Sequence, residues 1–121
     1  IPVVKNENGY FSGVEAVIDK DFAAEKLAET IDADILLILT AVENVKINFK
    51  KDNEENLKTL TADEAFKYIA KGEFAAGSML PKIEAGISFV SSGKNRTCII
   101  TNPENAINAI NGKTGTKIIG D

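Results

Sequence analysis

The sequence predicts an α/β fold in which a mainly parallel sheet is flanked by helices. Apolar, β-rich segments alternate along the chain with segments whose apolar residues recur at helical spacing. The connections between the predicted strands are long enough to hold helices, which favours right-handed βαβ crossovers. A chain of 121 residues supports one domain with one hydrophobic core. In such a sheet, ligands bind at the carboxyl ends of the strands.

Three strands are predicted in the first third of the chain. We expect strands at Ile1–Lys5 and Val14–Ile18, with a turn at Asn6–Gly9 after the first of them. Ile35–Leu39 is apolar throughout, which predicts a central strand that is covered on both faces.

A helix is predicted after Asp19, where the apolar spacing changes from that of a strand to that of a helix. Its inner face is expected to consist of Phe22, Ala23, Leu27, Ala28 and Ile31. Its outer face is expected to carry Glu25, Lys26 and Glu29.

The alternation continues to the end of the sequence. Val45–Phe49 is predicted to form a short strand and Lys50–Asn56 an exposed loop. Thr61-Ala-Asp-Glu64 is a capping box, which predicts a helix that ends near Gly72. A further helix is predicted from Pro81 to about Ser92, with Ile83, Ile87 and Val90 on its inner face. A strand is predicted at Thr97–Thr101 and another at Thr116–Ile119. Between these strands we expect a helix from Pro103 to Ile110, which ends at Gly112.

The composition excludes several classes of function. The chain contains no His, which excludes Ser-His-Asp catalysis and His-metal sites within these residues. The net charge of −4 argues against nucleic-acid binding, and no apolar segment is long enough to span a membrane. The single Cys98 is interpreted as a buried strand residue in a reducing, cytoplasmic setting. The Ile-Pro start without Met suggests a fragment.

Two lysines stand where predicted helices begin. Lys20 lies in Asp19-Lys20-Asp21, directly after a predicted strand, and Lys82 ends the stretch Gly77–Lys82. Helix N-termini attract anions, and a lysine in a first turn is unfavourable unless an anion is bound there. Each pattern therefore suggests phosphate binding, but a simple Asp19 cap and a solvated surface lysine remain open alternatives.

A third candidate lies at the exit of the Ile35–Leu39 strand. The short side chains of Thr40-Ala41-Val42 could floor an adenine or ribose pocket, and they could equally be packing residues. This pattern alone does not distinguish the two interpretations.

Together these motifs resemble the carbamate kinases, which are members of the amino-acid kinase superfamily. The resemblance rests on Gly13–Phe22, Asp34–Val42 and Phe74–Lys82, with support from Ile47–Phe49 and Gly112–Thr116. It covers essentially the whole chain. It implies that residues 1–121 form the nucleotide-binding C-terminal part of an amino-acid kinase fold, with the N-terminal portion absent.

The resemblance also implies an activity: reversible phosphoryl transfer between carbamoyl phosphate and ADP, giving ATP and carbamate, with Mg as cofactor. By position, Lys20, Asp21 and Lys82 would be catalytic, and no residue is assigned to a metal. The nucleotide would contact Lys20, Thr40, Val42, Val45, Lys46, Met79 and Lys82. The complete enzyme would be a cytoplasmic homodimer of arginine metabolism, with small-molecule substrates and neither nucleic-acid nor membrane partners.

Some residues depart from the family pattern, and other functions stay open. Ala76 replaces an expected Pro, Lys46 an expected aromatic residue, and Asp52 lies where the loop often carries Pro. The alternatives are another amino-acid kinase, acting on acetylglutamate, glutamate, aspartate or uridylate, and a non-catalytic nucleotide-binding fragment. The chain alone is expected to be inactive, because the phosphate loop and the acceptor site of the family have no counterpart in it.

Overall fold

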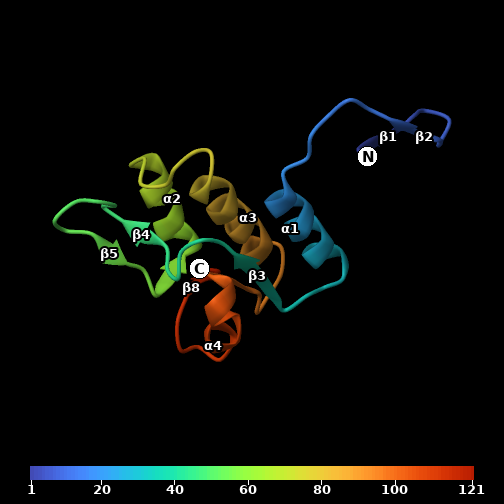
Figure 1. Cartoon of the computed structure of the whole chain (residues 1–121). Coiled ribbons are helices and arrows are strands. Elements are labelled where there is room, and N and C mark those ends of the chain that lie inside the picture. The colour runs from blue at the N-terminus through green and yellow to red at the C-terminus, as the bar shows by residue number, and fades with distance from the viewer.

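The computed structural model describes residues 1–121 as helices on both sides of a small sheet (Figure 1). The helices are α1 (Lys20–Thr30), α2 (Ala62–Ala70), α3 (Met79–Ser91) and α4 (Ala106–Ile110), with a short 3-10 helix, Pro103–Asn105, before α4. The strands are β1 (Val3–Lys5), β2 (Phe11–Gly13), β3 (Ile35–Leu39), β4 (Lys46–Ile47), β5 (Glu55–Asn56), β6 (Thr59–Thr61), β7 (Thr97–Thr101) and β8 (Thr116–Ile119).

The main sheet has four strands in the order β3-β7-β8-β6. Strand β3 pairs with β7 and β6 with β8 in parallel, whereas β7 and β8 are antiparallel. The predicted α/β class with a mainly parallel sheet is therefore confirmed. Because β3 lies at an edge of this sheet, its prediction as a central strand covered on both faces is wrong for this chain: Ile35 and Leu39 are exposed, and only Leu36 and Ile38 are buried.

The core lies between the sheet and the layer of α1, α2 and α3, while α4 lies on the opposite side of the sheet (Figure 1). Helix α3 approaches the strands closely at Gly86, where an added Cβ would lie 2.7 Å from Ile118 Cδ1 and 3.1 Å from Cys98 Sγ. The largest fully buried side chains include Phe89, Leu60, Ile83, Ile100 and Ile118. This packing fixes α3, and so fixes the residues at its start.

Several element predictions are confirmed. The capping box is complete, since Thr61 Oγ1 accepts from the Glu64 amide at 3.2 Å and Glu64 Oε2 accepts from the Thr61 amide at 2.9 Å. Gly72 takes the positive φ of 72° that ends the helix. The inner stripe of α3 is buried as predicted, and Cys98 is a buried strand residue. The strands Ile35–Leu39, Thr97–Thr101 and Thr116–Ile119 have the predicted bounds.

The beginning of the chain differs from the prediction. Val14–Ile18 is not a strand, and Val17 is 99% exposed, because no strand of this chain lies beside it. Instead β1 pairs with β2 as an antiparallel hairpin that stands apart from the main sheet (Figure 1). The predicted strand at Ile1–Lys5 is shortened to Val3–Lys5.

The middle of the chain also departs in detail. The predicted strand Val45–Phe49 is reduced to Lys46–Ile47, which pairs with Glu55–Asn56 as a short ribbon. The predicted exposed loop Lys50–Asn56 is therefore a loop only up to Glu54. The whole segment is exposed, as predicted. The three-residue strand Thr59–Thr61 was not predicted.

The predicted inner face of α1 is wrong except at Ala28, which is buried. Phe22, Leu27 and Ile31 are exposed, with Leu27 61% exposed, and Ala23 is exposed as well. The buried residues of α1 are Asp21, Glu25 and Ala28. This helix packs against α3 with two acidic side chains. Asp21 finds its polar partner, Lys82, on α3, whereas the ion-pair partner of Glu25, Lys26, lies on α1 itself. None of the helices combines the length and apolar character needed to cross a membrane.

Candidate phosphate and nucleotide site

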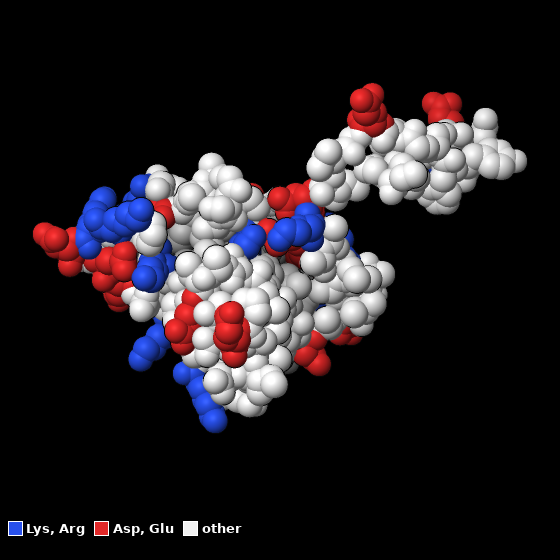
Figure 2. Space-filling view, in the orientation of Figure 1, with Lys and Arg blue, Asp and Glu red and all other residues white.

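Helices α1 and α3 begin side by side, and their first turns are joined by an ion pair. Lys82 Nζ donates to Asp21 Oδ2 at 3.0 Å, and each of the two residues is only 8% exposed. Asp19 caps α1, as expected, by accepting from the Asp21 amide at 2.8 Å. In Figure 2, red and blue atoms gather around the start of α1, beside largely uncharged surface.

The two charges of the buried pair interact differently with the dipoles of their own helices. Asp21, in the first turn of α1, is favourable at the positive end of its helix, whereas Lys82 is unfavourable at the positive end of α3. α3 carries no acidic residue in its first turn to offset that cation. Lys82 is therefore held in this position by Asp21 from a neighbouring helix.

Asp21 forms its ion pair with Lys82, and no ion pair joins Asp21 to Lys20. Lys20 is exposed as the first residue of α1 and borders a shallow cavity of about 500 Å³ together with Val17, Ile18 and Ala23. The structure thus brings together two of the three residues predicted to be catalytic and leaves the third, Lys20, adjacent in sequence and free in solvent.

The backbone at the start of α3 offers fewer free amides than the glycine and serine at Gly77–Ser78 suggest. The amides of Ser78 and Leu80 both donate to the Ala75 carbonyl, at 3.2 and 3.0 Å, and Pro81 has no amide hydrogen. A phosphate at this helix start would therefore depend chiefly on lysine side chains.

A small cavity of about 180 Å³ lies beside the start of α3. Three residues predicted to contact a nucleotide, Val42, Lys46 and Met79, line it. Its other lining residues are Asn44, Phe49, Glu73, Phe74, Ala75 and Ser78. Complete small-molecule sites typically enclose about 300 to 1,000 Å³, so this cavity is suited to one ring of a ligand rather than to all of it.

Two other predicted nucleotide contacts do not line this cavity. Val45 is fully buried in the core, and its amide donates to Thr116 Oγ1 at 2.8 Å. The Thr40 amide donates to the Thr101 carbonyl at 2.8 Å and so extends the pairing of β3 with β7. Both residues take part in the packing and pairing that follow β3, and their contact with a nucleotide stays a prediction.

Lys46 belongs to the charged β4–β5 ribbon, over which blue and red atoms mix in Figure 2. Its Nζ lies 3.1 Å from Glu54 Oε1, and Glu54 also accepts from the Lys50 amide at 2.9 Å. The hydrogen bond from the Lys50 amide, and to a lesser extent that from Lys46, lowers the pKa of Glu54. The long stem of Lys46 lines the cavity beside Phe49, where the family pattern led us to expect an aromatic residue.

The sequence reasoning missed part of the site. Phe49, Phe74 and Glu73 line the cavity, and Glu73 Oε2 accepts from the Asn48 amide at 2.8 Å, which shapes the cavity wall. Phe74 opens the stretch Phe74–Lys82 that carries the family resemblance, so its position was a usable signal. No group of three or more His, Cys, Asp or Glu side chains is arranged to hold a metal ion.

Comparisons with known proteins agree on one family. Residues 1–102 match the model of the amino acid kinase family. Carbamate kinase 2 of Staphylococcus aureus is 58% identical over 118 residues, which are 98% of this chain and 37% of that protein. The chain therefore spans little more than a third of the length of this relative.

Solved structures give the same result. A carbamate kinase from Giardia lamblia bound to AMP-PNP superposes with a TM-score of 0.92 at 47% identity, over 100% of this chain and 38% of that one. A protein from Aeropyrum pernix superposes with a TM-score of 0.91 at 39% identity, over 99% and 38% of the two chains. The comparisons confirm the resemblance to carbamate kinases that the sequence motifs indicated.

Proposed function

Because this chain belongs to the amino acid kinase family, we propose that it forms the nucleotide-binding part of an ATP:carbamate phosphotransferase. The reaction is reversible phosphoryl transfer between carbamoyl phosphate and ADP, which gives ATP and carbamate. The level of identity to carbamate kinase 2 of S. aureus supports this acceptor over those of other amino-acid kinases.

The observation that carries the proposal is the buried ion pair between Lys82 and Asp21 at the start of two helices. Burying two charges costs desolvation free energy, and apolar residues of similar volume often serve a fold equally well. The pair instead holds an ammonium group rigidly at the positive end of α3. A rigid cation at a helix start is suited to a nucleotide phosphate.

The remaining roles follow from position. Lys20, exposed beside this pair, would meet the charge that develops on the phosphoryl group during transfer. The cavity lined by Val42 and Met79 would take the adenine ring, with Phe74 and Phe49 in its wall. Asp21 is a positioning residue, because it acts on the ligand through Lys82.

This chemistry fits a chain without His. Phosphoryl transfer depends on positioning and charge neutralisation more than on proton shuttling. Mg²⁺ is typically held by substrate phosphates with a few carboxylates or waters, and when bound it would neutralise charge on the nucleotide phosphates. The chain's own lysines would then bind and orient the outer phosphate oxygens.

Calorimetric titration of the 121-residue chain with ADP and Mg²⁺ tests the proposal. We expect weak binding, with a Kd on the order of 1 mM or somewhat below, since only one side of the site is present. Lys82→Met should weaken it about tenfold, and Lys94→Ala, which changes an exposed lysine beyond the far end of α3, should leave it unchanged. Circular dichroism would verify that each variant is folded at the assay temperature.

A folded Lys82→Met variant that binds ADP as tightly as the unmodified chain would refute the role of Lys82. Absence of any ADP binding at millimolar concentration would refute the nucleotide assignment of the chain itself.

A further inference from the structure

Glu25 is a buried carboxyl group that the proposed reaction does not use. It lies one helical turn after Asp21 on the face of α1 that packs against α3, and it is only 1% exposed. Its Oε2 lies 3.8 Å from Lys26 Nζ, and its Oε1 has no hydrogen-bond partner. A buried carboxylate oxygen without a donor is costly, so this oxygen requires a proton or a donor.

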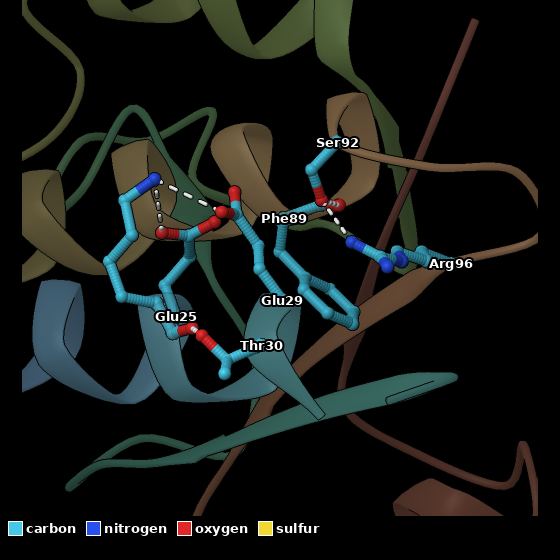
Figure 3. A network of polar contacts seen from close by, with 7 residues as sticks. Glu25, Glu29, Thr30, Phe89, Ser92 and Arg96 are labelled. Carbon is cyan, nitrogen blue, oxygen red and sulfur yellow. Dashed lines mark hydrogen bonds and ion pairs between the residues drawn. The ribbon is translucent and has the colours of Figure 1, made fainter. Parts of the chain in front are cut away.

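Glu29 lies next to it. Figure 3 shows the carboxyl groups of Glu25 and Glu29 pointing toward one another on the same side of α1. Lys26 Nζ lies 3.1 Å from Glu29 Oε2, so one ammonium group serves two carboxyl groups. Two carboxylates in contact repel each other strongly, and such pairs commonly retain one proton.

The pKa values agree with this geometry. Burial, then the hydrogen bond to Glu29 and the negative charge of Glu29, raise the pKa of Glu25 from 4.5 to about 7. Accepting that hydrogen bond, and the one from Lys26, lowers the pKa of Glu29. Both directions indicate that Glu25, the more buried of the two carboxyl groups, retains a proton more readily than Glu29.

The other charged groups around the pair are already engaged. Arg96, in the loop between α3 and β7, contacts Asp32 at 2.7 Å, hydrogen-bonds Ser92 and lies over the Phe89 ring. On α3, Lys82 is held by Asp21, and Glu84 is exposed. Strand β3, which also packs on α1, contributes only apolar residues.

We propose that Glu25 and Glu29, both on α1, hold one proton between them, and that this proton stabilises the packing of α1 against α3, in which Glu25 is buried. Loss of the proton leaves a second negative charge in the helix contact. Because the same contact holds Asp21 against Lys82 one turn away, deprotonation also weakens the ion pair at the start of α3. The pair is thus a pH-sensitive part of the contact between α1 and α3 beside the candidate site, and we call it the clamp. Only the effect of the clamp on nucleotide binding rests on the proposed function.

The direction of the effect follows from proton linkage. The folded chain holds the Glu25 proton up to about pH 7, while the unfolded chain releases it near pH 4.5. The stability that this proton contributes is therefore complete below pH 4.5 and is lost as the pH rises through 7. Glu29 has a lowered pKa, so the stability that its ionised form contributes is lost only as the pH falls into the acid range. The chain has no His to obscure this range.

Denaturant unfolding at pH 5.5 and 8.5 tests the clamp. The unfolding equilibrium constant of the unmodified chain should rise about tenfold or more between the two pH values, since each unit of pKa shift is a factor of ten. Glu25→Gln, which keeps the shape and removes the titration, should change less than about threefold over the same range. Glu84→Gln, an exposed change on α3, should retain the full pH dependence.

Carbon-13 NMR titration of the side-chain carboxyls of the unmodified chain gives a second result that needs no variant. A Glu25 carboxyl that titrates below about pH 5, or a Glu25→Gln variant that keeps the pH dependence, would overturn the clamp. ADP titrations at both pH values separate this inference from the proposed function. Absence of ADP binding with an intact pH effect on unfolding would leave the clamp standing and refute the nucleotide site.

Discussion

At the scale of single residues, the contact between α1 and α3 is governed by charge. Asp21, Glu25 and Lys82 are all less than a tenth exposed, so each needs a partner to offset the loss of its water shell. Asp21 and Lys82 satisfy each other across the helix contact. The cost of this arrangement becomes visible only when one partner is removed, because the other is then buried and unpaired.

A double-mutant cycle measures this coupling. Asp21→Asn and Lys82→Met should each destabilise the chain by about 3 kcal/mol, since each leaves a buried charge or donor without its partner. The double variant should be destabilised by clearly less than the sum, with a coupling free energy of about 2 kcal/mol. Urea unfolding at pH 6 would measure all four proteins. Strictly additive costs would show that the pair makes no interaction of consequence.

The sequence indicated one half of this pair better than the other. Lys82 was identified because a lysine in a first helical turn is electrostatically misplaced unless something compensates it. Its partner Asp21 lies 61 residues earlier, and the residue pattern alone did not pair the two, since spacing along a chain does not reveal which helices become neighbours. Glu25 carried no sequence signal, because a glutamate on a predicted helix ordinarily faces water.

At the scale of elements, helix α3 owes its position to Gly86. The glycine lets the helix backbone approach Ile118 and Cys98, both fully buried in the sheet. That approach sets the height of the start of α3 above the sheet, and with it the height of Lys82.

Gly86→Ala tests this packing. Alanine improves helix propensity by about 1 kcal/mol, but its Cβ would lie 2.7 Å from Ile118 Cδ1 in a packed core, which costs about 1 to 3 kcal/mol. We expect net destabilisation of about 1 kcal/mol in thermal or urea unfolding. Ser88→Ala, on the exposed side of the same helix, is the matched control and should be neutral or slightly stabilising. A stabilised Gly86→Ala variant would mean that α3 tolerates a larger separation from the sheet.

Elements with strong local signals were predictable, and those that depend on neighbours were not. The capping box at Thr61 and the stripe of Ile83 and Ile87 encode their helices locally. Val14–Ile18 has strand composition but gains no strand neighbour in this chain. The antiparallel direction of β8 could not be predicted either, because direction depends on how α4 returns the chain to the sheet.

At the scale of the whole molecule, our proposal makes the chain one side of a site. The cavity of about 180 Å³ and the Lys82–Asp21 pair lie around the start of α3, and the chain spans 37% of its S. aureus relative. Catalysis by positioning requires a fixed place for both reactants. We therefore expect the purified 121-residue chain to bind nucleotide weakly and to form no ATP from carbamoyl phosphate and ADP.

The most direct test is a chimera in which this chain replaces the matching 118-residue segment of carbamate kinase 2 of S. aureus. ATP formation from carbamoyl phosphate and ADP would be measured for the chimera, for the intact S. aureus enzyme and for the chain alone. We predict turnover by the chimera, a raised KM for ADP in its Lys82→Ala variant, and a lowered kcat with little change in KM in its Lys20→Ala variant. A folded chimera without activity, or one whose kcat and KM are unaffected by either substitution, would contradict the account.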